Sequence, residues 1–368
     1  MSGNAGQGAP EHPDVNVKRR LSDAYGRVRA TGTSPGVPAE QLRLVVFSDH
    51  HRGIRDGADD FERCEEAYNA ALGYYLEQGY TLVVLGDVED LWECRPKPVL
   101  EAYARTTLLE ADFQKEGRYV RVSGNHDDLW ENADAVRSHL APLYGEKLSV
   151  REGLLLSVDL AEGRKGEVFL THGHQGDQTS DRRSALYGVS KLVVRYGWRP
   201  LQRLTGWKLT TPAKSFELRE SHNLSMYAWA CGMRGAGRPP LVLIAGHTHV
   251  PVFASTDHVG LLRIQVEQLR ASLLLASTDA ARRAALDALA KKRALLESVR
   301  CRNSSDVASL GLQLPVPCYF NTGCCSYRDG DITGIELAEG QIRLVRWPDD
   351  DGDPARKILD ARDLRGIF

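Results

Sequence analysis

Residues 42–51 read LRLVVFSDHH, and residues 81–90 read TLVVLGDVED. In both stretches a short run of apolar, mostly β-branched residues ends directly at side chains that carry carboxylate oxygens or imidazole nitrogens. A nearly continuous apolar run is typical of a strand buried on both faces. Between the two stretches, apolar residues from Phe61 to Tyr75 recur at helical spacing, and Gly79 is a suitable end for that helix. The sequence therefore predicts an α/β fold.

The same succession of an apolar run and a polar end occurs five times. The predicted strands are Leu42 to Phe47, Thr81 to Leu85, Tyr119 to Val122, Val168 to Leu170 and Leu241 to Ala245. The polar runs that follow them are Ser48–His51, Gly86–Asp90, Gly124–Asp127, Thr171–His174 and Gly246–His249. Ligands bind at the carboxyl ends of the strands in such sheets, and divalent metals select Asp, Asn and His. If the strands are neighbours, these side chains converge on one metal site.

Taken in order, the polar runs follow the pattern D-x-H, G-D-x-x-D, G-N-H-D, a single His, and G-H-x-H. This order and spacing resembles the calcineurin-like metallophosphoesterase superfamily. The match runs from Asp49 to His249, and the closing strands are expected to extend it to about residue 347. The resemblance implies a four-layer αββα sandwich with a dinuclear metal site, to which this chain adds two helical insertions.

The resemblance also implies a specific set of ligands. One metal would be held by Asp49, His51 and His249, the other by Asn125, His172 and His247, and Asp87 would bridge them. A carboxylate can span two cations about 3.5–4 Å apart, and such a pair activates the water between them. The bridging hydroxide would then attack a phosphate ester or pyrophosphate bond. Mn is the first expectation because mixed carboxylate, carboxamide and imidazole ligation suits it, but Fe, Zn, Mg and Co accept the same ligands.

Four further residues are candidates for the chemistry. His126 directly follows a ligand without matching a ligand position, so we expect it to protonate the leaving oxygen. The family match implies that Asp90 holds that imidazole. Arg52 and His174 are candidates for contact with the substrate phosphate. A surface arginine and a solvated or hydrogen-bonded histidine are the alternatives for these two.

The composition suits one large domain with insertions. The chain has 368 residues and a formal net charge of −2, which argues against a wholly basic nucleic-acid binder. Seven cysteines without zinc-finger spacing favour reduced thiols in the cytoplasm. No stretch has the length and apolarity of a signal peptide or a membrane span.

The domain boundaries are read from the composition. Residues 1–40 are expected to be a disordered arm, or alternatively a weak basic tether, because Gly, Pro and small polar residues dominate there. The phosphoesterase domain is expected to cover residues 41–347 and to close with a strand from Cys318 and a hairpin up to Trp347. Residues 348–368 are expected to be a C-terminal tail, and the acidic run from Asp349 to Asp353 within it is expected to be solvated.

The first predicted insertion, residues 182–240, is strongly basic. It holds eleven Lys and Arg residues against two Glu residues. The functional interpretation is a helical cap that attracts a phosphorylated substrate or lies peripherally on an anionic membrane. The alternative is a solvated helix face.

A helical cap at this place is similar to the UDP-2,3-diacylglucosamine pyrophosphatase branch, where it helps to hold a lipid-linked nucleotide sugar. The phrases at residues 86–93 and 172–177 are similar to that branch too, although the branch commonly has Arg where His126 stands.

The second predicted insertion, residues 261–300, carries an apolar helical stripe. Leu262, Val266, Leu269 and Leu273 step by four, three and four residues. Either one long helix or a hairpin that turns near residues 277–279 fits this pattern. Such a stripe packs on its own domain or pairs with a second copy of the chain as a homodimer.

Three functional classes follow from the sequence. The complete ligand set together with His126 favours an enzyme. A metal-stabilised interaction scaffold is the second class, because some members of the superfamily have lost catalysis. A nuclease is the third, and nucleic acid is not the expected partner because separate DNA-binding modules are absent.

Overall fold

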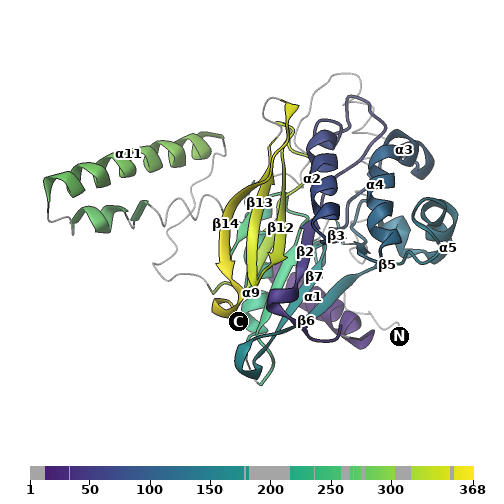
Figure 1. Cartoon of the computed structure of the whole chain (residues 1–368), viewed down its shortest axis with the longest axis horizontal. Helices are drawn as coiled ribbons and strands as arrows, with labels where there is room; N and C mark the ends of the chain where they lie inside the picture. Colours follow the sequence, from purple (N-terminus) through teal and green to yellow (C-terminus); the bar gives the residue numbers. More distant parts are fainter. Residues whose placement is uncertain are drawn as a thin grey trace, which may run out of the picture.

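The computed structural model describes residues 13–32, 34–177, 180–181, 216–235, 237–257, 266–267, 269–274, 278–302, 316–348 and 352–368. Within them, two seven-stranded sheets pack face to face (Figure 1). The first sheet has the order β1 (Val37–Pro38), β6 (Gly153–Asp159), β7 (Lys165–Thr171), β8 (Leu241–Ala245), β11 (Tyr319–Thr322), β9 (Pro251–Phe253) and β10 (Thr256–Asp257). The second sheet has the order β14 (Lys357–Asp363), β13 (Gln341–Trp347), β12 (Ile332–Ala338), β2 (Arg43–Phe47), β3 (Thr81–Leu85), β4 (Tyr119–Val122) and β5 (Val150–Arg151).

Helices cover the outer face of each sheet. The second sheet carries α2 (Glu65–Glu77), α3 (Pro96–Ala102), α4 (Ala104–Lys115), α5 (Ala133–Ala135) and α6 (Ala141–Tyr144) on its side of the molecule. The first sheet carries α1 (Pro13–Ala30) and α9 (Phe216–Gly232). Short 3-10 turns lie at η1 (Ala39–Gln41), η2 (Asp128–Glu131), η4 (Ala161–Gly163) and η8 (Leu364–Gly366), and a π turn at η3 (Val136–Leu140). Residues 266–267 and 269–274 are also helical, and they precede α11 (Asp279–Arg302).

The core between the sheets explains why the strands are apolar on both faces. Val46 and Val83 of the second sheet face Val168, Ile244 and Phe320 of the first, and all five are buried. Each sheet also packs against its own helices, so that neither face of the central strands meets water. The predicted four-layer αββα sandwich is confirmed.

Parallel pairing brings the predicted polar runs to one edge of each sheet. In the second sheet β3 lies between β2 and β4 and pairs in parallel with both. In the first sheet β7 and β8 are parallel neighbours. The five predicted strands are present, and the bounds of four of them match within a residue, because β-branched runs of four to six residues leave little choice of structure.

The prediction of a disordered arm is wrong for residues 13–30, which form α1. Val17, Leu21, Ala24 and Val28 are buried on one side of this helix, against the first sheet and α9. These apolar residues recur every three or four positions, so the helix is amphipathic. The average composition of residues 1–40 conceals this stripe. Residues 1–12 lie outside the described residues.

The prediction of a C-terminal tail after the domain is wrong for residues 357–368. In the acidic run, residues 349–351 lie outside the described residues. β14 pairs antiparallel with β13 and forms the edge of the second sheet. Beyond it, Leu364 and Ile367 are buried in the core between the sheets. Burial of these two side chains offsets the entropy cost of ordering the last residues.

The basic insertion is described only in part. Residues 182–215 lie outside the described residues, so the prediction of a cap is not tested there. The following segment forms α9, whose Met226, Trp229 and Ala230 are buried against the first sheet. That part of the predicted insertion therefore belongs to the outer helical layer.

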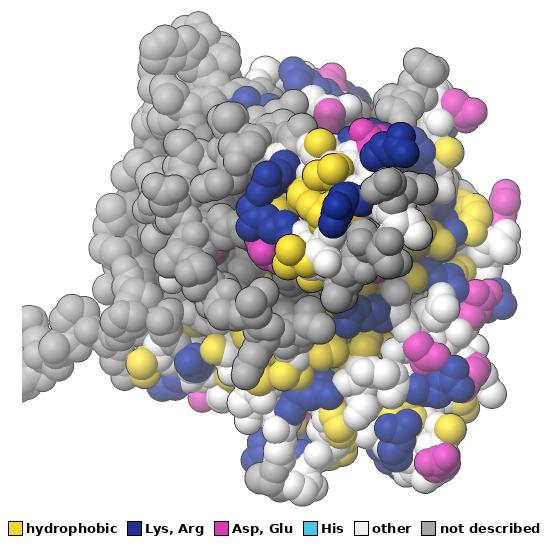
Figure 2. Space-filling model, turned by 90° about the vertical axis from the view of Figure 1, so that its left-hand side faces the viewer, with side chains coloured by type: hydrophobic (Ala, Val, Ile, Leu, Met, Phe, Trp, Pro, Cys, Tyr) yellow, Lys and Arg dark blue, Asp and Glu magenta, His cyan; other side chains and the backbone are white. Residues whose placement is uncertain are grey.

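Of the two arrangements left open for residues 261–300, the structure has the hairpin. Val266, with Leu269 and Leu273 beside it, packs against Leu289 of α11. Oγ1 of Thr278 caps the second helix. The hairpin projects from the body (Figure 1), and the face seen from that side mixes Lys and Arg with hydrophobic side chains (Figure 2). Homodimer formation through this segment stays a prediction.

None of the described helices combines the length and the apolarity that crossing a membrane requires.

Candidate metal centre

The polar runs after five strands meet where the carboxyl ends of the two sheets face each other. The second sheet contributes Asp49 and His51 after β2, Asp87 after β3, and Asn125 after β4; the first sheet contributes His172 after β7, and His247 and His249 after β8. The structure thus brings together all seven predicted ligands, in two clusters.

The first cluster consists of Asp49, His51 and His249. Oδ1 of Asp49 lies 3.2 Å from Nε2 of His249 and 3.9 Å from Nε2 of His51. The two imidazole Nε2 atoms are 3.1 Å apart. Oδ1 of Asp49 is buried and has no hydrogen-bond partner among the described residues. A buried carboxylate oxygen without a hydrogen bond is costly, and a cation at this point would satisfy it.

The second cluster consists of His172, Asn125, His247 and Asp87. Nε2 of His172 lies 3.2 Å from Oδ1 of Asn125 and 3.2 Å from Oδ2 of Asp87. Nδ1 of His172 donates a hydrogen bond of 2.6 Å to the main-chain oxygen of Leu85. This bond places the proton on Nδ1 and leaves the Nε2 lone pair directed at the cluster, as in metal-binding histidines.

Asp87 lies between the two clusters. Its Oδ2 is 3.2 Å from Nε2 of His172 in one cluster and 3.8 Å from Nε2 of His51 in the other. Its Oδ1 accepts a hydrogen bond of 2.8 Å from the main-chain N–H of His126. This is the position that a bridging carboxylate requires. The mixed set of carboxylate, amide and imidazole donors fits a pair of divalent metals.

The electrostatics keep both buried carboxylates ionised. Burial acts to raise the pKa of Asp87, but the nearby imidazoles of His172 and His126 lower it well below its ordinary value. Burial likewise acts to raise the pKa of Asp49, and His249 and His172 bring the net pKa below the ordinary value. Anionic carboxylates are what a metal site needs, because protonated ones cannot bind the cation.

The backbone of the ligand loops is unusual. Five of the seven predicted ligands have a left-handed φ: Asp49 (55°), His51 (52°), Asp87 (51°), His247 (68°) and His249 (57°). This conformation is uncommon for residues other than glycine. It costs of order 1–3 kcal/mol per residue and concentrates at functional sites. The loops therefore hold these side chains in a geometry that local propensity does not favour.

Two glycines allow the ligand loops to approach closely. A Cβ on Gly124 would overlap the carboxylate of Asp87, and a Cβ on Gly246 would lie 2.5 Å from Oδ2 of Asp49. The glycines of the G-N-H-D and G-H-x-H runs are therefore required by close packing around the ligands.

A buried charged network holds the loops after β3 and β4 together. The Asp127 carboxylate accepts hydrogen bonds from the main-chain N–H groups of Val88, at 3.1 Å, and Gly124, at 2.6 Å. Arg121 of β4 pairs with Glu89 and lies 3.6 Å from Asp127. The sequence reasoning missed Arg121. An arginine inside a strand that is otherwise apolar is the signal that indicates a buried ion pair.

His126 lies beside the clusters with the partner that the resemblance implied. Its Nδ1 is 3.0 Å from Oδ1 of Asp90. Burial acts to lower the pKa of His126, but the carboxylates of Asp90 and Asp87 outweigh burial and raise it to about 9. The indole ring of Trp92 stacks on the imidazole, with ring centroids 4.4 Å apart.

The prediction that Arg52 contacts substrate is wrong. Arg52 is buried, and its guanidinium pairs with the buried carboxylate of Glu110. His174 lies closer to the expected place, with its ring centroid 5.4 Å from that of His172 and 6.4 Å from that of His247. Its contact with a substrate phosphate stays a prediction.

Three residues near the second cluster were missed by the sequence reasoning. Oδ2 of Asp177 lies 3.1 Å from Nε2 of His247. On α9, the ring of His222 lies 5.3 Å from the ring of His247, and Oδ1 of Asn223 accepts a hydrogen bond of 3.1 Å from Thr248. Asp177 belongs to the sequence 172–177, whose similarity to the pyrophosphatase branch could have indicated it. Nothing in the sequence indicated His222 and Asn223, because a contact between residues about 25 positions apart has no local pattern.

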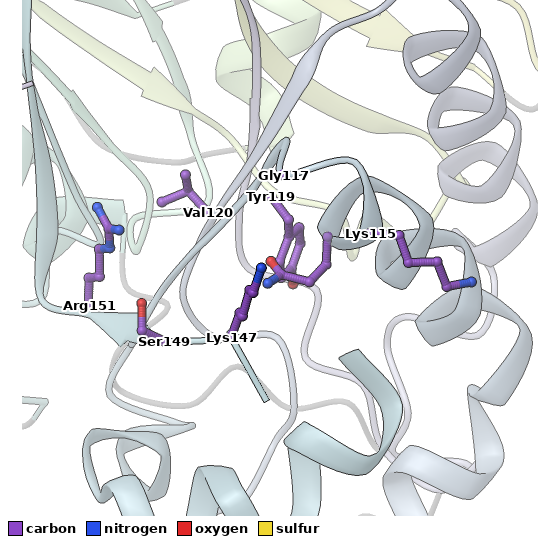
Figure 3. Close-up of a pocket in the computed structure, with 8 residues that line it drawn as sticks. Lys115, Gly117, Tyr119, Val120, Lys147, Ser149 and Arg151 are labelled. Carbon is purple, nitrogen blue, oxygen red and sulfur yellow. The ribbon is translucent and has the colours of Figure 1, made fainter. Parts of the chain in front are cut away.

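A separate pocket of about 270 Å³ lies between the end of α4 and the strands β4 and β5 (Figure 3). Its lining residues are Gln114, Lys115, Gly117, Tyr119, Val120, Lys147, Ser149 and Arg151. None of the predicted ligands is among them, so this pocket is not the metal centre.

The two-sheet sandwich and its paired clusters of Asp, Asn and His define a class of metal-binding α/β proteins. Residues 42–251, more than half of the chain, match the model of the calcineurin-like phosphoesterase family. The chain belongs to this family. Its members use divalent metals, and the clusters described above are where this chain offers ligands for them.

No curated protein matches the chain. Among solved structures, the chain is similar to vacuolar protein sorting 29 from Cryptosporidium parvum. The identity is 12%, the match covers 88% of this chain and 98% of that chain, and the TM-score is 0.34.

Proposed function

We propose that this protein is a dinuclear metal-dependent phosphoesterase that hydrolyses a phosphate ester or pyrophosphate bond. The observation that carries the proposal is the position of Asp87 between two clusters of ligand side chains, with distances of 3.2 and 3.8 Å to one imidazole of each. Two divalent ions, when bound, supply a water of lowered pKa and neutralise charge on the phosphoryl oxygens.

The residues of the chain have distinct roles in this proposal. Asp49, His51 and His249 hold one ion, Asn125, His172 and His247 hold the other, and Asp87 bridges them. His126 donates a proton to the leaving oxygen, since Asp90 holds its Nδ1 and leaves Nε2 for the substrate. His174, next to His172 and His247, contacts a phosphoryl oxygen.

The experiment that tests the proposal combines metal analysis with hydrolysis assays. Wild-type protein should contain about two divalent ions per chain, with Mn as the expected metal, and should hydrolyse an aryl phosphate, its diester or a nucleotide sugar. Asp87→Ala should lose both metal and activity. Asp112→Ala, which removes an exposed aspartate on α4, is the matched control and should keep both. Equal metal contents in wild type and Asp87→Ala would overturn the two-metal model.

A lipid-linked nucleotide sugar, as in the UDP-2,3-diacylglucosamine pyrophosphatase branch, is the second candidate substrate. The observation in its favour is that α9, which follows the basic segment, contacts the ligand loop through His222 and Asn223. Arg219 lies one turn earlier on that helix, and three or four residues on a helix share a face. A cationic side chain on this face suits a substrate with two phosphates. Preference for the nucleotide sugar over the aryl phosphate in the same assays would support this candidate.

A metal-stabilised scaffold without catalysis is the alternative to an enzyme. The His126–Asp90 pair has no evident use in a scaffold, and its retention beside the clusters supports catalysis. Full metal occupancy without hydrolysis of any of these substrates would favour the scaffold.

For an enzyme of this kind, contact of residues 182–240 with an anionic membrane would bring it to a lipid-linked substrate. Sedimentation with vesicles that contain an anionic phospholipid tests that contact.

A further inference from the structure

The ring of His126 is in contact with an aromatic neighbour on its face. The centroids of His126 and Trp92 are 4.4 Å apart, and their planes differ by 15°, which is a stacked arrangement. Trp92 is only 4% exposed, so surrounding atoms restrict its own movement. A stacked pair of this kind resists rotation of either ring out of the common plane.

The hydrogen bond to Asp90 does not by itself determine the plane of the imidazole. The bond joins Nδ1 to Oδ1 at 3.0 Å and fixes one atom of the ring. Rotation about the last side-chain bond of histidine has broad preferences, so the rotamer does not define the plane either. The ring of His51 lies perpendicular to that of His126, at 89° and 4.7 Å. Of these two aromatic neighbours, Trp92 is the one whose ring lies nearly parallel to the His126 imidazole.

The segment that carries Trp92 is itself attached to the main chain of His126. The N–H of Leu91 donates a hydrogen bond of 3.0 Å to the main-chain oxygen of His126. The N–H of Cys94 donates a bond of 2.8 Å to the oxygen of Asp90, which closes a helical turn around Trp92. Asp90 and Trp92 therefore belong to one helical turn. That turn is hydrogen-bonded to the main chain of His126, whose ring both side chains contact.

We propose that Trp92 is a positioning residue, which fixes the plane of the His126 imidazole by stacking and so fixes the direction in which Nε2 donates a proton. The inference rests on the proposed phosphoesterase function. In the step concerned, the bond between phosphorus and the leaving oxygen breaks, and that oxygen keeps the electron pair and takes the proton from Nε2. Water adds to phosphorus and releases a proton, and the imidazole takes up one proton to regain the one that it donated. A tilted ring would donate this proton poorly, and only leaving groups that need it would suffer.

The first test compares leaving groups. Trp92→Ala should lower kcat by about 10–100-fold for phenyl phosphate, part of the usual effect of a proton donor, and much less for 2,4-dinitrophenyl phosphate, which leaves without a proton. KM should change little. Trp92→Phe keeps a ring at this place and should restore most of the activity. Trp347→Ala, which removes a buried indole of β13 that packs on Tyr74 and Tyr75 of α2 and not on His126, should not change the ratio between the two substrates.

The second test needs neither metal nor activity. In metal-free protein with labelled histidines, the Cε1–H signal of His126, assigned with His126→Asn, should lie upfield because of the indole ring current. Trp92→Ala should move it downfield, and Trp347→Ala should leave it in place. An unchanged signal in a folded Trp92→Ala variant would overturn the inference, as would equal losses on the two esters. If wild type hydrolyses no ester, the proposed function fails, while the signal still decides whether Trp92 orients the ring.

Discussion

Arg52 and Glu110 form a buried two-point ion pair in the helical layer over the second sheet, with Nη1 3.3 Å from Oε2 and Nη2 2.5 Å from Oε1. The hydroxyls of Tyr68 and Tyr144 donate to the same carboxylate, at 2.9 and 2.5 Å. Arg52 follows a predicted ligand in the chain, yet its side chain points away from the metal centre. It connects the ligand loop after β2 to α4.

This pair gives a prediction for stability. Glu110→Gln leaves the guanidinium of Arg52 buried without a charged partner and should lower the free energy of unfolding by about 3–5 kcal/mol. The double variant Arg52→Met/Glu110→Leu removes both charges and should cost less than the single variant. Urea denaturation of the three proteins measures the difference. A smaller loss in Glu110→Gln than in the double variant would contradict the prediction.

The same carboxylate predicts a dependence on pH. Burial acts to raise the pKa of Glu110, but Arg52 and the hydrogen bonds bring it below its ordinary value. A carboxylate whose pKa is depressed by folding stabilises the protein above the unfolded pKa, about 4.3. This contribution is lost as the pH falls through the pKa of the folded state. Wild type should therefore lose more stability between pH 5 and pH 3 (roughly the window set by that unfolded value) than Arg52→Met/Glu110→Leu does, measured by denaturation at each pH.

The proton donor gives a prediction for catalysis. His126→Asn should lower kcat by about 10²–10⁴-fold, the range expected when a positioned general acid is removed. Its metal content should stay near that of wild type, because His126 holds no ion in the proposed site. Asp90→Asn should have a smaller effect in the same direction. Metal analysis accompanies the assay, and a variant that has lost its metal would speak against this role.

The close approach at Gly124 gives a prediction for metal binding. Gly124→Ala places a methyl group against the carboxylate of Asp87 and should reduce the metal content together with the activity. The matched control is Gly73→Ala in α2, where the added methyl group meets no atom within 4 Å. That control should be more stable by about 1 kcal/mol, because alanine favours a helix. Normal metal binding in Gly124→Ala would show that the loops have room to adjust.

The packing of α1 predicts that the N-terminal segment contributes to stability. Leu21 is fully buried, and Leu21→Ala should lower the free energy of unfolding by about 2–5 kcal/mol. Val15 is 53% exposed on the same helix, and Val15→Ala should change stability by less than about 0.5 kcal/mol. If the two variants unfold at the same denaturant concentration, α1 does not pack on the first sheet in solution.

The parts of the fold that could be predicted from the sequence share a physical reason. Strands such as β3 and β8 were predicted because a buried strand between two layers is nearly continuous in apolar residues. A metal site was predicted because Asp, Asn and His at strand ends have no use in a core, and the family resemblance implied which seven residues are the ligands. Parallel pairing then placed them together.

Other features depend on contacts that the sequence does not reveal. The direction of the Arg52 side chain is decided by Glu110, which lies 58 residues away. The left-handed φ of Asp87 is set by the loops around it and has no local signature. In α1, polar residues and glycine outnumber the buried positions, so the average composition concealed the helix. The stack of Trp92 on His126 joins two loops from different strands.

The metal centre takes His172, His247 and His249 from one layer of the sandwich and the remaining predicted ligands from the other. In the proposed two-metal site, neither sheet alone offers all the ligands of either ion, so retention of the ions should require both layers to be packed together. Metal binding by this protein would therefore be coupled to the last step of folding, in which the two sheets pack together.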